Sequence, residues 1–446
     1  MRTCKRAAGA PLFAAITFAA LAGSPLAQAE TVDELKQAID VLTRQVAELE
    51  RQQASAARER ASDATKTVTA GATKGSFKLP GSDTSVTFGG YVKLDAVFSN
   101  PSAGVDNAGD LQLSPSSIPV GPEAGDHEHN QVKFGARETR LFAKTNTPTS
   151  LGDLDAHVEV DFYGADGNES VSNSHGLRLR HAYFSLGRFL AGQTWTNFMN
   201  PAALPETVDF GGPAGQIFDR QAQVRWTDAF ALPGVAAPAR WSIALENPET
   251  VAQVPGGTSF RADDDHVPDV TGQVALDTSS GRFSVHGLLR QVSVDSGAAP
   301  VANARRIGGG ISVAGVVPVI GKDDLRFTAS AGNAIGRYAN GFFPDAIVDA
   351  RGDVALPTQW TVFAGYRHFW TERLRSSLVL SMAHENNPAS APANTNRSAR
   401  SAHVNLIWTP VDRADVGVEY IYADRETEDG QTGHLNRLQA SAKYAF

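Results

Sequence analysis

The chain ends in Asn436-Arg437-Leu438-Gln439-Ala440-Ser441-Ala442-Lys443-Tyr444-Ala445-Phe446. In an extended backbone, one face of this stretch carries Leu438, Tyr444 and Phe446, and the other carries Arg437, Gln439 and Lys443. This period of two predicts a β-strand with one apolar and one polar face. An edge strand of a soluble sheet has this pattern, and so does a lipid-facing strand of an outer-membrane barrel with interfacial aromatic residues. The rest of the chain decides between these two interpretations.

The N-terminus has the pattern of a secretory signal peptide over residues 1–29. Basic residues are followed by an apolar stretch, and Ala27-Gln28-Ala29 forms a cleavage site, so that Glu30 begins the mature chain. The single cysteine, Cys4, is removed with the signal, which excludes disulfide and thiol chemistry from the mature protein. Cleavage leaves 37 Lys and Arg against 48 Asp and Glu, a net charge of −11, which argues against nucleic-acid binding.

Residues 30–60 are expected to form a helix with a narrow apolar stripe. Seam residues recur at alternating spacings of three and four, which is the heptad pattern of a coiled coil. One alternative is an amphipathic helix lying on its own domain. β-Branched residues at one seam position with Leu at the other favour a two-stranded coiled coil. The seam consists of Val32, Leu35, Ile39, Leu42, Val46 and Leu49.

After a polar linker over residues 61–76, the sequence changes to repeated alternation of apolar and polar residues, often charged. In 153–163, for example, Leu154 and Val158 alternate with Asp155 and Glu159. No run of 18 apolar residues follows residue 29, so a transmembrane helix is not expected. Frequent charges on one strand face suit a barrel with a polar lumen. Sixteen strands are predicted, near 86–98, 131–145, 153–163, 177–187, 189–196, 217–227, 239–246, 268–277, 282–293, 304–315, 324–334, 357–368, 371–384, 398–409, 413–423 and 435–446.

The predicted connections alternate between long and short. Residues 99–130, 164–176 and 197–216 are long, whereas 146–152 and Gly187-Arg188 are short. Long outer loops and short periplasmic turns are typical of outer-membrane barrels. We therefore expect an all-β membrane protein, a 16-stranded antiparallel transmembrane barrel over 77–446. The C-terminal strand would close the barrel, and the C-terminus and the N-terminal helix would lie on the periplasmic side. The parity of 131–145 and 177–187 is ambiguous and fits a bulge or a slip.

Five segments carry a resemblance to a known family: Phe77–Asp95, Ala136–Leu141, Leu177–Tyr183, Leu190–Trp195 and Gly365–Trp370. Together they resemble DcaP-like outer-membrane porins. This resemblance implies a sixteen-stranded barrel, a homotrimer with a periplasmic coiled coil, and passage of small anionic solutes such as dicarboxylates. The implied trimer departs from the dimer that the seam residues favour, and we predict the trimer because packed barrels can override so short a seam.

A porin needs a constriction and an electric field rather than catalytic groups. The predicted constriction is the loop 197–216, whose Gly and Pro residues allow it to fold into the lumen; the alternative is a loop that caps the barrel from outside. A basic wall opposite this loop would select anions, since an Arg fork binds carboxylate with two hydrogen bonds. Alternatively, the arginines pair with Asp155, Glu159 and Asp161 in a structural ladder. The candidates are Arg178, Arg180, Arg140, Arg137, Lys93, Arg220 and Arg326 on the wall, with Arg290, Arg306, Arg367 and Arg375 as further ones, and Glu206, Asp209, Phe210, Gly211 and Gly212 in the loop.

Other patterns are weaker. His127-Glu128-His129 lacks a third metal ligand, Asp263-Asp264-Asp265-His266 would bind a divalent cation or bridge lipopolysaccharide only weakly, and Arg351-Gly352-Asp353 is a tripeptide that is common by chance. We expect no metal, no cofactor and no enzymatic activity, with outer-membrane lipid and lipopolysaccharide as surroundings. A different class of function is a tether, in which the barrel is an anchor and the coiled coil is the functional element.

Overall fold

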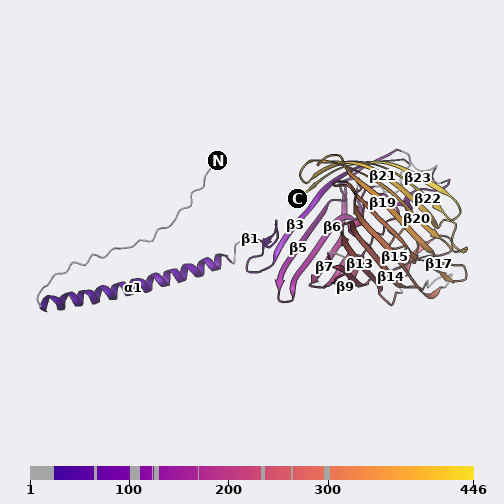
Figure 1. Ribbon diagram of the computed structural model, residues 1–446. Coiled ribbons are helices and arrows are strands. Elements are labelled where there is room, and N and C mark those ends of the chain that lie inside the picture. The colour runs from indigo at the N-terminus through magenta and orange to yellow at the C-terminus, as the bar shows by residue number, and fades with distance from the viewer. Residues whose placement is uncertain are drawn as a thin grey trace. The chain divides into compact units, whose positions relative to one another are not determined.

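A computed structural model describes residues 25–64, 68–100, 111–122, 124, 130–168, 170–232, 237–262, 265–295 and 302–446 (Figure 1). The chain forms two compact units, one with the N-terminal helix and one with the strands. The helix α1 spans Pro25–Ala64 and includes the residues that were predicted to be helical. No helix within the described ranges combines the length and the apolar character needed to cross a bilayer.

The second unit is a closed antiparallel barrel, in which each strand pairs with its neighbours in the sequence. The last strand pairs with the first long one, from Asn436 opposite Asn100 to Ala445 opposite Tyr91, and this pairing closes the barrel. The wall consists of β3 (Ser85–Asn100), β4 (Gln131–Gly135) continued by β5 (Arg140–Thr149), β6 (Gly152–Asn168), β7 (Ser174–Leu186), β8 (Phe189–Trp195), β9 (Arg220–Phe230), β10 (Ala239–Glu246), β13 (Asp269–Thr278), β14 (Gly281–Asp295), β15 (Asn303–Pro318), β16 (Asp324–Asn333), β19 (Thr358–Phe369), β20 (Leu374–Asn386), β21 (Asn396–Val411), β22 (Ala414–Thr427) and β23 (Thr432–Ala445).

Counting β4 and β5 as one wall position, the described residues form sixteen strands, which confirms the predicted number. The alternation also has the predicted sense. On β23, the side chain of Leu438 is 49% exposed on the outer surface, whereas Gln439 is fully buried inside. Apolar side chains therefore form a belt on the outer surface, and polar ones line or fill the lumen.

The two strands of ambiguous parity each contain an irregularity. In the β6–β7 pairing, Glu159 lies opposite His181 and Val160 opposite Leu179, so Arg180 is the extra residue of a bulge. Between β4 and β5, residues 136–139 turn, with the N–H of Thr139 donating to the carbonyl of Ala136 at 3.0 Å. Both irregularities change which residues face the lumen. Neither position contains a Gly or Pro from which the irregularity could be predicted.

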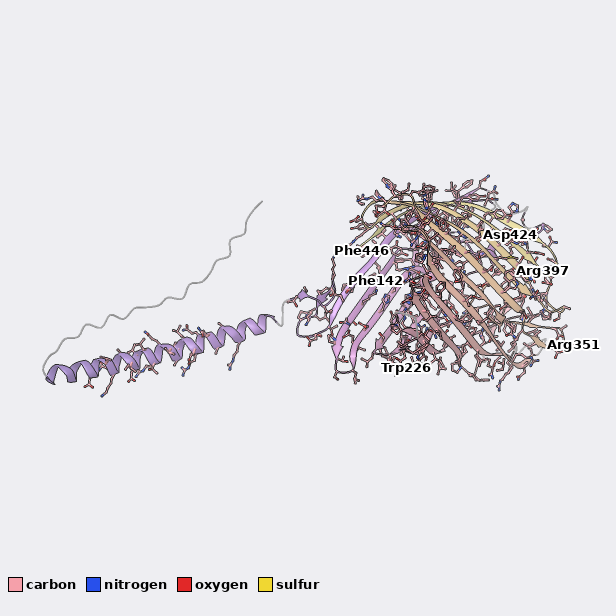
Figure 2. The ribbon with its side chains drawn as sticks, in the orientation of Figure 1. Phe142, Trp226, Arg351, Arg397, Asp424 and Phe446 are labelled. Atoms are coloured by element: carbon pink, nitrogen blue, oxygen red, sulfur yellow. The ribbon has the colours of Figure 1, made fainter. Side chains whose placement is uncertain are left out.

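The two rims of the barrel differ. One, which we call the turn rim, carries short connections such as 150–151, 187–188 and 412–413, and Phe446 lies at this end in Figure 2. The other, the loop rim, carries the long connections, and the labelled Arg351, Arg397 and Asp424 lie there. The long connection predicted at 164–176 is wrong, because β6 and β7 extend further and leave only 169–173 between them. The connection of moderate length expected at 424–434 is also shorter, since β22 and β23 leave only 428–431. The ends of strands that extend into water have no apolar face. Alternation of apolar and polar residues therefore does not show where such strands end.

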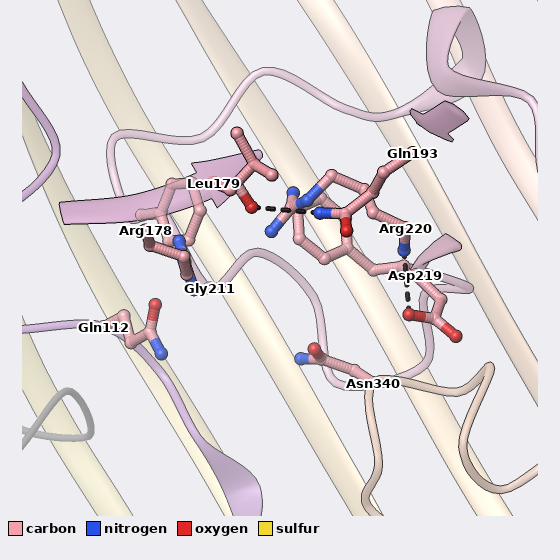
Figure 3. Close-up of a pocket in the computed structure, with 10 residues that line it drawn as sticks. Gln112, Arg178, Leu179, Gln193, Gly211, Asp219, Arg220 and Asn340 are labelled. Atoms are coloured by element: carbon pink, nitrogen blue, oxygen red, sulfur yellow. Dashed lines mark hydrogen bonds between the residues drawn. The ribbon is translucent and has the colours of Figure 1, made fainter. Parts of the chain in front are cut away.

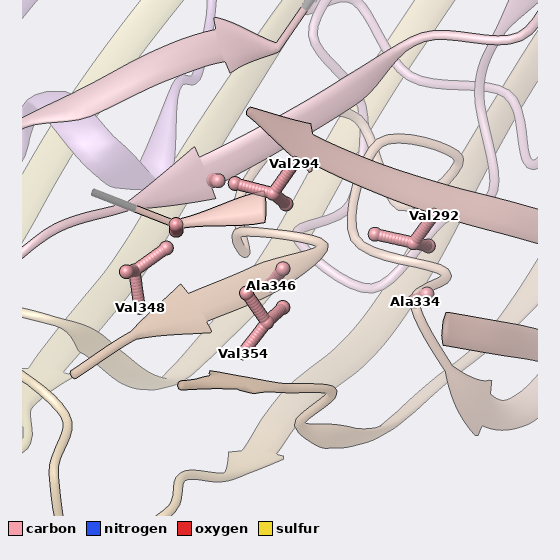
Figure 4. Packing of buried hydrophobic residues seen from close by; sticks show 8 residues of the cluster. Val292, Val294, Ala334, Ala346, Val348 and Val354 are labelled. Carbon is pink, nitrogen blue, oxygen red and sulfur yellow. The ribbon is translucent and has the colours of Figure 1, made fainter. Parts of the chain in front are cut away.

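Long connections of the loop rim pack on one another and into the barrel. A second sheet joins two of these connections, through parallel pairing of β11 with β17. An apolar cluster packs this sheet against β14 and includes Val292, Val294, Ala346 and Val354 (Figure 4). A second cluster joins the β8–β9 loop to the β16–β19 connection through Phe198, Ile335 and Tyr338. The short elements in these regions are β11 (Thr250–Gln253), β12 (Ser259–Ala262), β17 (Ala346–Val348), β18 (Val354–Ala355), η2 (Pro115–Ser117) and η3 (Pro201–Ala203), while β1 (Thr69–Ala70) and β2 (Phe77–Lys78) precede β3.

Candidate functional site: the lumen loop and the arginine wall

The connection between β8 and β9, residues 196–219, enters the barrel and is held there at its root by one carboxylate. Glu246 on β10 accepts hydrogen bonds from the hydroxyl of Thr196 and the backbone N–H of Asn197, both at 2.7 Å. Its Oε1 also accepts from the hydroxyl of Thr271 at 2.7 Å. A buried carboxylate with several donors is a strong anchor, because each donor would otherwise be desolvated without a partner. We call this segment the lumen loop.

The lumen loop then crosses the barrel, and its backbone is held by side chains from distant strands. Arg326 on β16, Asn405 on β21 and Lys93 on β3 all donate to loop carbonyl groups. The loop therefore spans the interior from wall to wall, and irregular backbone is tolerated because protein groups satisfy it. The three acceptors are the carbonyl oxygens of Leu204, Glu206 and Val208, at 2.8, 2.9 and 2.7 Å.

The tip of the lumen loop contacts the far wall and another loop. Glu419 on β22 accepts hydrogen bonds from the backbone N–H groups of Val208 and Asp209, at 2.8 and 3.2 Å. The carboxylate of Asp209 in turn accepts from the N–H groups of Leu113 and Gly212, both at 2.9 Å. The bond from Leu113 joins the lumen loop to the β3–β4 connection. Burial raises the pKa of the Asp209 carboxyl.

Arginines and aromatic rings are interleaved along the wall that faces the loop tip. Tyr163 of β6 stacks on Phe210 of the loop, with ring centroids 5.1 Å apart. The guanidinium of Arg178 lies over both rings, at 5.1 and 5.4 Å from their centroids. Stacking of this kind holds a guanidinium in place without neutralising its charge. The other contacts in this arrangement are Arg137 over Tyr163, Arg180 over Phe210 and Trp195, and Arg220 over Trp195 and Phe218.

Two acidic residues of β6 pair with the arginines of β7. Arg178 donates through Nε and Nη2 to Asp161, at 2.9 and 2.7 Å. Arg180 donates to Glu159 at 2.8 Å and to Asp161 at 3.0 Å, and it is only 2% exposed. Arg180 is therefore a structural residue of the wall, whereas 29% of the Arg178 side chain stays exposed to the lumen. Two of the three acidic residues named as ladder candidates form this ladder; the third, Asp155, accepts a hydrogen bond from Asn146 instead.

Arg220 at the start of β9 differs from Arg178 and Arg180 in having no carboxylate partner among the described residues. Within the described part of the chain, no carboxylate lies within 4 Å of its guanidinium, and its Nη1 is buried without a hydrogen-bond partner. Its flat face rests on Trp195, 4.8 Å from the ring centroid. A buried N–H group without an acceptor is costly, so an anion bound at this position would satisfy Nη1 of Arg220.

Arg178 and Arg220 line the same cavity of about 210 Å³, where the lumen loop meets the wall (Figure 3). The cavity is bounded by the wall, by the lumen loop and by two other connections of the loop rim. Apart from the two arginines, its lining is mostly neutral, with one carboxylate. The remaining lining residues are Gln112, Leu179, Gln193, Phe210, Gly211, Phe218, Asp219 and Asn340. The sequence did not single out Gln112, Gln193, Asp219 or Asn340, because they lie on separate elements.

The other basic candidates are distributed over the barrel. Lys93 is buried against Glu138 and Asp95, Arg140 lies 3.5 Å from Glu159, and Arg326 pairs with Asp324. Arg137 is buried and donates to the carbonyl of Ala165. Among the further candidates, Arg290 is fully buried between Asp269 and Asp345, Arg306 donates to the carbonyl of Val354, and Arg367 and Arg375 contact the carboxylate of Glu206.

Among the residues that the structure describes, the weaker motifs do not form a site. His127-Glu128-His129, Asp263 and Asp264 lie outside the described residues. Asp265 accepts a hydrogen bond from Thr250 at 2.9 Å, and the residues that the structure describes contain no group of three or more potential metal ligands. Arg351 and Asp353 are exposed in the turn between β17 and β18, where Arg351 contacts Asp349 at 3.4 Å.

A closed sixteen-stranded barrel with an apolar outer belt, and with a loop folded across its lumen, defines a porin-type outer-membrane channel. The chain belongs to the DcaP outer membrane protein family, whose match covers residues 20–446. A comparison with curated protein sequences gave no match.

Solved structures show the same fold. The outer membrane channel DcaP of Acinetobacter baumannii superimposes with a TM-score of 0.71 at 24% sequence identity, covering 85% of this chain and all of that one. An anion-selective porin from Comamonas acidovorans has a TM-score of 0.50 at 13% identity, covering 81% of this chain and all of that one. OmpT of Vibrio cholerae has a TM-score of 0.50 at 11% identity, covering 81% of this chain and 98% of that one.

Proposed function

We propose that this barrel is a passive diffusion channel for small anionic solutes such as dicarboxylates, with the cavity at Arg178 and Arg220 as its selective passage. The observation that carries the proposal is Arg220, a lumen guanidinium with no carboxylate within ion-pair distance in the described residues. An anion that enters the cavity would supply the missing hydrogen-bond acceptor, whereas a cation would meet unbalanced positive charge.

The cavity also suits a solute with more than one acidic group. Arg178 and Arg220 both line it, so one carboxylate of a solute would meet Arg220 and a second would lie near Arg178, although Nε and Nη2 of Arg178 already donate to Asp161. The lining amides of Gln112 and Asn340 supply neutral donors for the remaining oxygens. Because the lumen loop bounds this cavity through Phe210 and Gly211, we infer that the loop sets the size limit of the channel.

For the assembly, the proposal is a homotrimer in which α1 forms a coiled coil in the periplasm. Leu35, Ile39, Leu42, Val46 and Leu49 are each more than half exposed on α1 and recur at spacings of four, three, four and three. An exposed stripe of this kind requires a partner surface, and a second and a third copy of the same helix would supply it. Signal cleavage at residue 29, a coiled coil over 30–60 and a linker over 61–76 complete this arrangement.

The surroundings of the barrel follow from its outer surface. Phe88, Trp408 and Tyr444 are each more than half exposed on the outside of the wall, among aliphatic side chains. Such a surface is stable only in contact with outer-membrane lipid and lipopolysaccharide or with another barrel.

The test is the ratio of chloride to potassium permeability in planar bilayers for two charge reversals. Arg220→Glu and Arg178→Glu should each lower the ratio, with the larger change for Arg220, whose charge is not balanced by a neighbouring carboxylate. Arg188→Glu is the matched control, because Arg188 is 61% exposed on the turn 187–188 and lies outside the lumen. Equal ratios in all three variants would refute the assignment of selectivity to this cavity.

A further inference from the structure

A second pair of lumen arginines binds a carboxylate that belongs to the protein itself. Glu206 extends from the lumen loop toward the turn rim and is enclosed by Arg375 on β20 and Arg367 on β19. Arg375 donates through Nη2 to Oε1 at 2.8 Å and through Nε to both carboxylate oxygens at 3.0 Å. Arg367 donates through Nη1 to Oε2 at 3.2 Å. A small carboxylate solute would be bound with the same geometry.

The surrounding charges show that Glu206 balances a positive region. Arg326 and Arg367 share Asp324, and Arg375 and Lys443 share Asp415. These four cations therefore have two wall carboxylates, and Glu206 is the third negative group. Burial raises the pKa of Glu206, but the hydrogen bonds and charges of Arg375 and Arg367 outweigh it and hold that pKa below its ordinary value. Without Glu206, the region would keep two uncompensated positive charges.

The position is open to water. The side chains of Glu206, Arg367 and Arg375 are 23%, 22% and 14% exposed, and Glu206 and Arg375 line a cavity of about 100 Å³. The backbone of the loop at this residue is held separately, because the carbonyl of Glu206 accepts from Asn405. The loop therefore keeps an anchor at residue 206 when its carboxylate is removed.

We propose that Arg367 and Arg375 form a second carboxylate-binding site in the lumen, and that Glu206 occupies it as a tethered competitor. This inference deepens the proposed anion passage: solutes selected at Arg220 meet a second basic site that the loop's own side chain keeps filled. A solute carboxylate can bind there only when the Glu206 side chain moves away.

The test is chemical rescue of the refolded full chain in detergent. Glu206→Ala removes the carboxylate and leaves its space empty, whereas Glu206→Gln removes the charge and keeps the space filled. Sodium acetate should raise the Tm of Glu206→Ala well above its value in sodium chloride at equal ionic strength. We expect acetate to bind Glu206→Ala at least about tenfold more tightly than Glu206→Gln or the unaltered protein, as the hydrogen bonds of one carboxylate to arginine imply.

The double variant Glu206→Ala with Arg375→Gln should lose the rescue, because the fork that binds acetate is gone. Equal effects of acetate on all variants would overturn the proposal, and so would a rescue that survives Arg375→Gln. If Glu206→Ala does not refold in either salt, Glu206→Ser takes its place in the experiment. Serine also removes the carboxylate and empties most of its space, but it keeps a polar group, and the same acetate rescue is expected. The acetate experiment measures binding and not transport. Cation selectivity of the channel would therefore refute the proposed function but would not change the outcome of the acetate experiment.

Discussion

The carboxylate of Glu419 on β22 accepts a hydrogen bond from the backbone N–H of Val208 at 2.8 Å, across 211 positions of the chain. The same carboxylate accepts from Asp209, His403 and Asn405. One buried side chain of the far wall thus holds the tip of the lumen loop, which bounds the cavity at Arg178 and Arg220.

Replacing Glu419 by Ala should release the loop tip. Four donors lose their acceptor in a buried place, so we expect the free energy of unfolding to fall by about 3 kcal/mol or more. Single-channel conductance should rise at the same time, because the loop no longer lies against the wall. Denaturant unfolding in detergent and planar-bilayer recordings measure the two effects.

Glu372→Ala is the control for this variant, since Glu372 is 80% exposed and pairs with Lys322 on the surface. An exposed pair of this kind contributes less than about 1 kcal/mol. If Glu419→Ala behaved like Glu372→Ala in both measurements, the anchoring role of Glu419 would be wrong.

Anion selectivity should increase as the pH falls through about 6. Burial raises the pKa of Asp219 to about 6, against the opposing charge of Arg337. Asp219 lines the cavity beside Arg220, so protonation of its carboxylate adds one unit of positive charge to the passage. The permeability ratio of chloride to potassium, recorded from pH 7.5 down to pH 5, should rise through this range.

Asp219→Asn isolates this effect from the titration of histidines. The variant should show the high ratio at every pH in the range and no step near 6. A step of unchanged size in Asp219→Asn would assign the pH dependence to another group.

Removing residues 30–60 distinguishes the channel hypothesis from the tether hypothesis. If the barrel is the functional element, this deletion leaves single-channel conductance and selectivity unchanged, because the helix and the barrel are separate compact units. Cross-linking of the purified protein should show fewer trimers, since the apolar stripe of α1 is lost. Loss of conductance with intact, folded barrels would favour a functional role for the helix.

Deletion of Phe446 should lower the amount of protein in the outer membrane. The residue ends the closing strand, its backbone N–H donates to the carbonyl of Gly90 at 3.1 Å, and its ring is half exposed. We expect refolding in detergent to be nearly unaffected, because one terminal hydrogen bond contributes about 1 kcal/mol. An unchanged yield in the outer membrane would show that the assembly machinery does not need this aromatic end.

The wall of the barrel was predictable because lipid and lumen impose opposite chemistry on alternate residues. Leu438 and Gln439 show this on the closing strand, and every predicted strand corresponds to one in the structure. The bulge at Arg180 was not predictable, since nothing in the sequence distinguishes an inserted residue from a slip of register.

The site was predictable as a set of residue types but not as a set of contacts. The sequence named Arg178, Arg180 and Arg220 together, yet their states differ because β6 supplies Asp161 and Glu159 to the first two. The segment 189–196 contains no acidic residue, and this was the available signal that Arg220 lacks a partner on that side. Contacts of the lumen loop with Glu246, Glu419 and Arg375 join residues far apart in the sequence, so no local pattern encodes them.

The most direct test of the account is the reversal potential of the unaltered protein in a KCl gradient across a planar bilayer. We predict a potential of the sign that corresponds to higher chloride than potassium permeability, shifted toward zero by Arg220→Glu. A potential of the opposite sign in the unaltered protein, meaning cation selectivity, would contradict the proposed anion channel.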